Sequence, residues 1–287
     1  MDIKDLCIPV ADGFRIAATM YQNDNEGANV NRVILINSAA AVKRGFYESY
    51  ALYLVEQGFC VVTFDYRGIG NSRPASLKEF SACMREWGEK DMAGMINWIG
   101  SELNPAKLFV VAHSVGGQLV ALANNNCRID AMVTVGAQNG YWKLYDPPKR
   151  YQQYISARFI VPMLTWICGY LPMKRLGQGE DMPKGVALEW ASWCLNRRYM
   201  FGDRSLGSLE NIRSFKGSVF AYSMEDDTWA TSHAVDELMR FYTAAKITRR
   251  HVRLSDVGAS TLGHFGFFRT TFRSTLWRET ADWLKQH

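Results

Sequence analysis

A serine at an abrupt change of sequence pattern is the first candidate for chemistry in this chain. Ser114 follows an apolar run of strand character, 108–112, and a helical pattern begins at 118. That order predicts a strand, a sharp turn and a helix. Such a turn needs small residues beside the serine, and Ala112, Gly116 and Gly117 meet that need. A serine hydroxyl raised from a sheet edge in this way becomes a nucleophile when a base removes its proton.

Two stretches resemble the α/β-hydrolase family. The turn 112–116 is similar to the nucleophile elbow G-x-S-x-G, with alanine in place of the first glycine. The run Asp65-Tyr66-Arg67-Gly68-Ile69-Gly70-Asn71-Ser72 resembles the D-x-R-G-x-G-x-S loop of esterases and peptidases in that family. Within the family, the stretch 182–194 looks similar to a bacterial subgroup of hydrolases whose substrates are unassigned.

The elements predicted around these motifs are those of an α/β fold. The chain opens with an antiparallel hairpin, 5–21, around the Asp12-Gly13 turn. Strands joined by helix-length segments predict a mostly parallel central sheet with helices on both faces, as in the α/β-hydrolase fold. The later predicted strands are 32–37, 59–64, 108–112, 131–137, 218–223 and 251–257, and the predicted helices are 47–57, 86–99, 118–124, 234–245 and 271–286.

The resemblance implies a Ser-Asp-His triad in that chain order. The family places its base after the last strand, where this chain has His264. The acid follows the penultimate strand in a pattern similar to G-x-x-D-x-x-h-P, and that register selects Asp226, with Asp227 as the alternative. The remaining histidines lie beside the nucleophile, at a helix start, at a strand start and at the C-terminus (His113, His233, His251, His287).

The same resemblance implies an oxyanion hole made of two backbone N–H groups. Val115, directly after the serine, supplies one of them. The other comes from the loop after the 32–37 strand, where Asn37-Ser38-Ala39 stands in place of the family's His-Gly-x. This alignment selects Ala39, and Ala40 is the alternative one residue further on.

About eighty residues separate the strands 131–137 and 218–223, more than an ordinary crossover needs. We therefore expect two parts: a hydrolase core, 1–140 and 216–287, and an inserted, mainly helical cap, 141–215. The insertion is rich in aromatic residues, which line a substrate pocket or form the cap's own small core. The pocket candidates are Trp142, Trp190 and Trp193.

Composition narrows the class of protein further. The net charge of +5 is small for 287 residues, and the basic pairs are scattered, so nucleic-acid binding has little support. Six widely spaced cysteines without a C-x-x-C pair or a histidine cluster predict neither a zinc site nor a redox dithiol, and we expect reduced, mostly buried thiols and no cofactor.

The N-terminus has no apolar signal region, so we expect a cytoplasmic protein. The longest apolar segment, 159–173, is interrupted by proline and glycine and falls short of the roughly 20 residues that cross a bilayer. That segment is therefore predicted to be a buried or lid element, and no membrane span is expected.

The resulting hypothesis is a serine hydrolase that cleaves a carboxylic ester or related acyl bond through an acyl-enzyme intermediate. The aromatic cap favours an apolar acyl substrate. The same triad also serves thioesterases and acyltransferases, and the fold hosts proteins that bind ligands without turning them over. The sequence leaves the natural substrate and the oligomeric state open.

Overall fold

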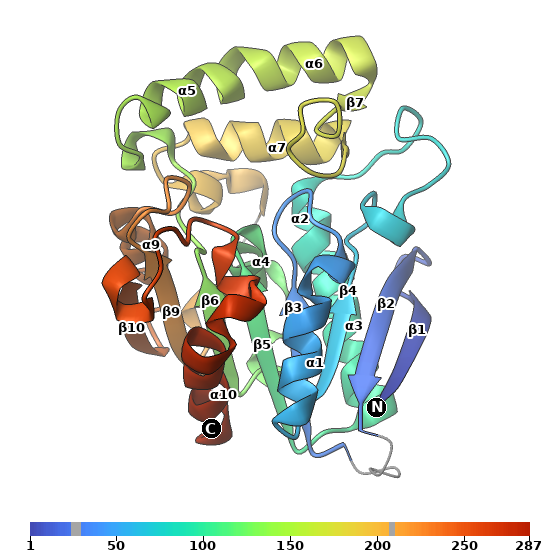
Figure 1. The fold of residues 1–287 in the computed structure, drawn as a ribbon. Helices are drawn as coiled ribbons and strands as arrows, with labels where there is room; N and C mark the ends of the chain where they lie inside the picture. The colour runs from blue at the N-terminus through green and yellow to red at the C-terminus, as the bar shows by residue number, and fades with distance from the viewer. Residues whose placement is uncertain (24–29, 207–209) are drawn as a thin grey trace.

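The computed structural model describes residues 1–23, 30–206 and 210–287. Its centre is an eight-stranded sheet in the order β1-β2-β4-β3-β5-β6-β9-β10 (Figure 1). β1 and β2 form the antiparallel hairpin, β2 pairs antiparallel with β4, and all further pairs are parallel. The strands are Asp2–Pro9, Arg15–Gln22, Arg32–Asn37 (β3), Cys60–Phe64 (β4), Lys107–His113 (β5), Ala131–Val135 (β6), Ser218–Met224 (β9) and Lys246–Val252 (β10).

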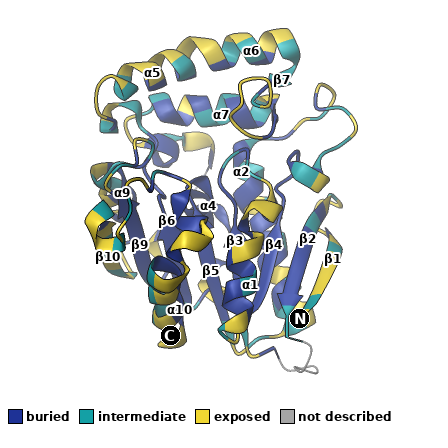
Figure 2. Ribbon diagram, viewed as in Figure 1, coloured by how far each residue is buried: buried dark blue, intermediate teal, exposed yellow. Residues whose placement is uncertain are grey.

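The central strands are buried on both faces, because helices cover each side of the sheet (Figure 2). Alternate residues of β3 enter different cores: Val33 and Leu35 join one, Ile34 and Ile36 the other. The first core includes the helical stretch 84–103, α4 (Val115–Leu119) and α9 (Ser232–Met239). The second core includes α1 (Glu48–Glu56) and α10 (Arg278–Lys285). The predicted α/β-hydrolase fold is confirmed.

Two predicted boundaries near the C-terminus are wrong. The helix expected at 234–245 ends at Met239, and the strand expected at 251–257 is β10, Lys246–Val252. His251 therefore lies inside the strand rather than at its start. β10 is an edge strand whose side chains are mostly polar, so its hydrophobic pattern is weak, and its pairing with β9 determines where it begins.

The segment 141–215 leaves the sheet after β6 and returns at β9, and these two strands pair directly. Its helical stretches 149–168 and 184–195 lie above the carboxyl ends of the parallel strands (Figure 1). The outermost element is one continuous helical stretch, 149–168, that lies over α7 (Lys184–Leu195). In chain order the segment contains α5 (Lys149–Ile155), a π-helical stretch (Ser156–Ile160), α6 (Val161–Cys168), β7 (Tyr170–Leu171), β8 (Met182–Pro183), α7 (Lys184–Leu195) and α8 (Glu210–Arg213).

Composition leaves two expectations that the structure narrows or corrects. The stretch that begins at 159 is predicted to be a buried or a lid element, and exposed Phe159, Met163 and Trp166 exclude the buried alternative. Of the six thiols only Cys60 and Cys194 are buried, so the expectation of mostly buried thiols is wrong: Cys7 lies on the edge strand β1, and Cys168 ends the outer helix. Within the described ranges, no helix is both long and apolar enough to cross a membrane.

The start of α4 is packed tightly against the ends of β3 and β6. A Cβ atom added at Gly116 would lie 2.6 Å from the backbone oxygen of Asn37, and one added at Gly117 would lie 2.6 Å from the Cβ of Ala137. Backbone atoms cannot move aside as flexible side chains can. The glycines therefore allow α4 to approach β3 and β6 closely.

We predict that Gly116→Ala lowers the free energy of unfolding by about 1–3 kcal/mol, because the added methyl group collides with backbone. Gly45→Ala is the matched control, since a Cβ there has no atom within 4 Å and Gly45 has no positive φ. Urea denaturation of both variants measures the difference. Equal free energies of unfolding of the two variants would show that the helix can accept a methyl group at position 116, and would contradict the prediction.

Candidate active site

Ser114 occupies a strained turn between β5 and α4. Its φ of 52° and ψ of −120° lie outside the regions that L-residues ordinarily adopt. The conformation is held on both sides: the Ser114 N–H donates to the Val135 carbonyl at 2.9 Å, and the Ser114 carbonyl accepts from the Gly117 N–H at 3.0 Å. The side chain is only 9% exposed and lines a large cavity. This is the sharp strand–turn–helix that the sequence predicts around Ser114.

His264 and Asp227 form a buried pair beside this turn. His264 Nδ1 lies 2.7 Å from Asp227 Oδ2, and the other carboxylate oxygen accepts the N–H groups of Trp229 at 2.8 Å and Ala230 at 3.0 Å. Because the carboxylate is the acceptor, Nδ1 carries the proton and Nε2 is left free to accept one. Gly136 makes room for the pair, since a Cβ there would lie 3.0 Å from the histidine ring.

The contact expected for Asp226 is therefore wrong by one residue. Asp226 accepts the N–H groups of Leu262 and Gly263 and the hydroxyl of Thr261, at 2.8–3.0 Å, and so holds the loop that leads to His264. Partial burial raises the pKa of Asp226, but the Gly263 and Leu262 N–H groups outweigh it and lower the pKa below its usual value. The turn after β9 decides which of the two neighbouring carboxylates faces the histidine.

A second buried hydrogen-bond chain joins this loop to the loop after β3. His113 Nε2 lies 2.9 Å from the His264 carbonyl, and a carbonyl only accepts, so Nε2 carries the proton. Nδ1 then accepts from the Tyr47 hydroxyl at 2.9 Å, and that oxygen accepts the Ala39 N–H at 2.9 Å. Burial lowers the pKa of His113 well below its usual value, which keeps the ring neutral.

This chain bears on the predicted oxyanion hole. Ala39 N–H, the predicted donor, already donates to Tyr47, because the hydroxyl of Tyr47 reaches the turn from the buried side. Ala40, the alternative, comes next and lines the cavity together with Ala39 and Val115. Val115 is the first residue of α4, where a backbone N–H has no partner within its own helix.

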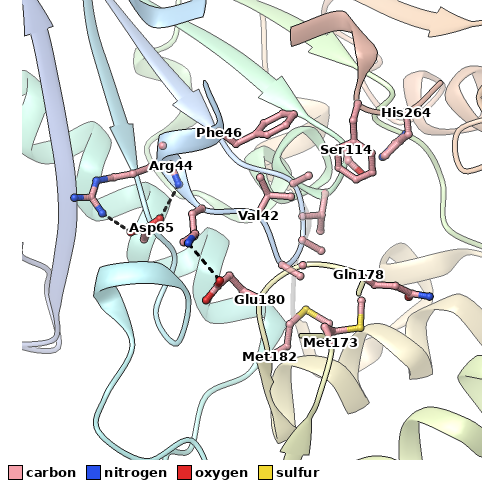
Figure 3. A pocket seen from close by; sticks show the side chains of 18 of the residues that line it. Val42, Arg44, Phe46, Asp65, Ser114, Met173, Gln178, Glu180, Met182 and His264 are labelled. Carbon is pink, nitrogen blue, oxygen red and sulfur yellow. Dashed lines mark hydrogen bonds and ion pairs between the residues drawn. The ribbon is translucent and has the colours of Figure 1, made fainter. Parts of the chain in front are cut away.

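The cavity that contains Ser114 and His264 has a volume of about 1210 Å³ (Figure 3). Its wall combines the loop after β3 with the hairpin of β7 and β8, which contributes Met173, Gln178 and Met182. The hairpin is tied to that loop, because Glu180 N–H donates to the Ala41 carbonyl at 2.8 Å and the Glu180 carboxylate lies 3.6 Å from Lys43 Nζ. Both sides of the cavity are thus connected.

Of the three predicted pocket tryptophans, Trp190 lines this cavity and Trp142 and Trp193 do not. Trp193 is buried in the hydrophobic core that the segment shares with one face of the sheet, and its Nε1 donates to Asp203 at 2.9 Å. Trp142 packs against Tyr154 with ring centroids 4.8 Å apart. Of the three tryptophans, Trp190 alone therefore has the predicted place in the cavity wall.

Sequence reasoning missed the polar end of the cavity. Gln118 Nε2 donates to Gln138 Oε1 at 3.2 Å, and both side chains line the cavity. Tyr199, from the 141–215 segment, donates its hydroxyl to Gln118 Oε1 at 2.7 Å from a backbone with φ of 53°. Gln138 follows β6 as Asp226 and Asp227 follow β9, so polar residues at strand ends were the available signal.

No three His, Cys, Asp or Glu side chains come together as a metal-ligand set in residues 1–23, 30–206 and 210–287. Several titratable groups of the cavity pair with each other or with backbone. Asp65, for example, accepts the backbone N–H groups of Arg44 and Asn71 and pairs with the Arg44 guanidinium.

Comparison with known proteins supports the same class. Residues 31–172 match the family described as alpha/beta hydrolase fold. No significant match is found among curated proteins. The chain belongs to the α/β-hydrolase fold family, in agreement with the strand order and the elbow.

Solved structures with a similar fold include esterases and a lipase at low identity. A soluble variant of monoglyceride lipase from Saccharomyces cerevisiae, in complex with a substrate analogue, is 14% identical with a TM-score of 0.70 over 100% of this chain and 95% of that one. An esterase of Pyrococcus furiosus is 13% identical with a TM-score of 0.63, covering 99% and 92%. An Exiguobacterium antarcticum esterase is 13% identical with a TM-score of 0.61, covering 98% and 100%.

We predict that Tyr47→Phe lowers the free energy of unfolding by about 1–3 kcal/mol, because the Ala39 N–H and His113 Nδ1 lose a buried partner. Tyr66→Phe is the matched control: the Tyr66 hydroxyl is equally buried, and among the described residues it has no hydrogen-bond partner. Chemical denaturation of both variants tests the difference. A loss that is the same in both would mean that the Tyr47 hydroxyl stabilises nothing through the chain.

Proposed function

We propose that this protein is a serine hydrolase that cleaves a carboxylic ester of a small acyl substrate. The observation that carries the proposal is the shared cavity: Ser114, in its strained turn, and His264, oriented by Asp227, line the same wall. The fold's likeness to esterases agrees with this reaction class. The proposed roles are nucleophile for Ser114, general base and acid for His264, and orienting carboxylate for Asp227 in place of Asp226.

The proposed reaction has two stages. His264 Nε2 takes the Ser114 proton as Oγ attacks the ester carbonyl, and the protonated ring then gives that proton to the leaving alcohol. Water, activated by the same Nε2, releases the acid from the acyl-enzyme. Asp227 holds the ring with Nδ1 protonated and stabilises the imidazolium that forms in each stage. Its two backbone donors keep the carboxylate fixed while the charge on the ring changes.

The negative charge on the carbonyl oxygen requires two donors at one point. We propose the N–H groups of Val115 and Ala40, since the Ala39 N–H is engaged with Tyr47. The Ala39–Tyr47 bond then has a positioning role, because it fixes the turn from which Ala40 projects. Such preorganised amides contribute about 3–4 kcal/mol to catalysis in other serine hydrolases.

The segment 141–215 is proposed to act as a cap that shapes the substrate site. Met173, Met182 and Trp190 come from this segment. Val42 and Phe46 line the same cavity from the chain between β3 and α1 (Figure 3). An apolar acyl or alcohol group suits that wall. The amides of Gln118 and Gln138 provide a polar end that would accept a carbonyl or hydroxyl group of the substrate.

A fluorophosphonate probe tests the proposed function directly. Its phosphorus bonds covalently to an activated serine and loses fluoride, so we expect labelling of the native protein at Ser114 and none of Ser114→Ala. Peptide mass spectrometry identifies the labelled residue. Absence of labelling in native protein would overturn the proposal in favour of a ligand-binding role. Hydrolysis of acyl esters of graded chain length then ranks substrates by kcat/KM.

The choice of acid yields a paired prediction. Asp227→Asn should lower kcat by about 10²–10⁴-fold, because His264 loses the carboxylate that selects its tautomer. Asp226→Asn keeps the His264–Asp227 bond and weakens only the loop before it, so we expect a loss within about tenfold. Steady-state kinetics on both variants, with circular dichroism as the folding check, separates them. The reverse order of effects would assign the acid to Asp226.

A further inference from the structure

The outermost helical stretch of the molecule, residues 149–168, exposes its large apolar side chains and buries smaller or polar ones. Its inner face, over α7, has residues at a spacing of four that are small, branched or polar: Gln153, Ala157, Val161 and Thr165, all buried. A helix on a globular protein ordinarily turns its large apolar side chains inward. Here they point outward.

The outward face is strongly apolar. Trp166 is 80% exposed and Ile167 62%. Among the described residues, thirteen large hydrophobic side chains are exposed, and eight of them lie on this one stretch (Figure 2). We call these eight the outer stripe: Tyr151, Tyr154, Ile155, Phe159, Ile160, Met163, Trp166 and Ile167. Apolar patches of this extent on a protein surface mark a site of interaction.

The positive charge of the chain comes from the part of the sequence that contains this stretch. The chain has 33 Lys and Arg and 28 Asp and Glu, and residues 147–179 contain five of the former and none of the latter. The rest of the chain, with 28 of each sign, is therefore neutral. Arg158, Lys174 and Arg175 are exposed, and neither arginine has an ion pair among the described residues, whereas Lys174 pairs with Glu180 at 3.0 Å.

The composition distinguishes between possible occupants of the stripe. A second copy of this chain would bring the same cations against each other, which opposes self-association. Aromatic side chains mixed with basic residues and no acids are instead what an anionic bilayer surface attracts, since rings enter the headgroup region and cations meet lipid phosphates. The stretch is about 30 Å long and lies on the outside of the molecule (Figure 1), so it can lie flat on such a surface.

We propose that the outer stripe docks the protein onto an anionic lipid membrane. The helix rests in the interface and does not cross the bilayer. Docking this way leaves the sheet and both termini facing away from the membrane and holds the outer helix against the lipid (Figure 1). The cavity, which Met173, Met182 and Trp190 of the same segment line, then lies on the side of the molecule that faces the membrane. The proposal does not depend on the chemistry of Ser114.

Vesicle sedimentation tests the docking. We expect the full-length protein to bind vesicles of phosphatidylcholine with about one third phosphatidylglycerol and to bind pure phosphatidylcholine at least about tenfold more weakly. Phe159→Ser combined with Trp166→Ser should weaken binding to the anionic vesicles by about tenfold or more. Arg158→Gln combined with Arg175→Gln should also weaken it and reduce its dependence on salt. Ser114→Ala should bind as native protein does.

Matched controls remove similar side chains elsewhere. Ile3→Ser removes an exposed apolar side chain on β1, and Lys216→Gln with Lys246→Gln removes two exposed cations; both should bind as native protein does. Thermal melts check that every variant is folded. The proposal is overturned if anionic vesicles fail to bind native protein, or if controls and stripe variants lose binding equally. It is also overturned if light scattering shows a dimer that the Phe159 and Trp166 substitutions dissociate while vesicles are not bound.

Discussion

The hydrogen bond between His264 and Asp227 connects the loops after the last two strands of the sheet, β9 and β10. Neighbouring residues fix the position of both side chains. Asp227 is held by two backbone N–H groups, its neighbour Asp226 holds the loop that carries the histidine, and Gly136 leaves space for the ring. A buried carboxylate and an imidazole remain together only when their other hydrogen-bonding atoms are also satisfied. These contacts come from three strand ends, so the parallel sheet is what brings them to one place.

The same reasoning extends to the buried chain of Ala39, Tyr47, His113 and the His264 carbonyl. The three hydrogen bonds run in one direction only, and in that direction every donor and acceptor in the hydrogen-bond chain has a partner. Burial lowers the pKa of His113, which keeps its ring neutral. The chain links the backbone of His264, the proposed base, to the turn proposed to stabilise the oxyanion. A displacement of the loop after β3 would therefore also displace the loop that carries His264, because Tyr47 and His113 are hydrogen-bonded to both.

The 141–215 segment faces two environments. Its β7–β8 hairpin closes one wall of the cavity and is tied to the loop after β3 through Glu180. Its outer helix turns large apolar side chains and Arg158 away from the protein. These two features are compatible with one role in which a surface-held protein receives an apolar substrate under its cap. The sequence shows the excess of basic residues in 147–179. Only the structure shows that the large apolar side chains of the same stretch are exposed, because this depends on which face of the helix is buried.

The sequence alone determined the fold class and the elbow, because continuous β-branched runs, helix-length connections and a serine among small residues are local patterns with few structural solutions. It also selected His264 through a likeness to the family. It did not determine which of Asp226 and Asp227 meets that histidine, whether Ala39 or Ala40 is free, or which tryptophan lines the cavity. Neighbouring residues have similar propensities, and only the turn geometry and packing between distant strands decide which side chain points inward.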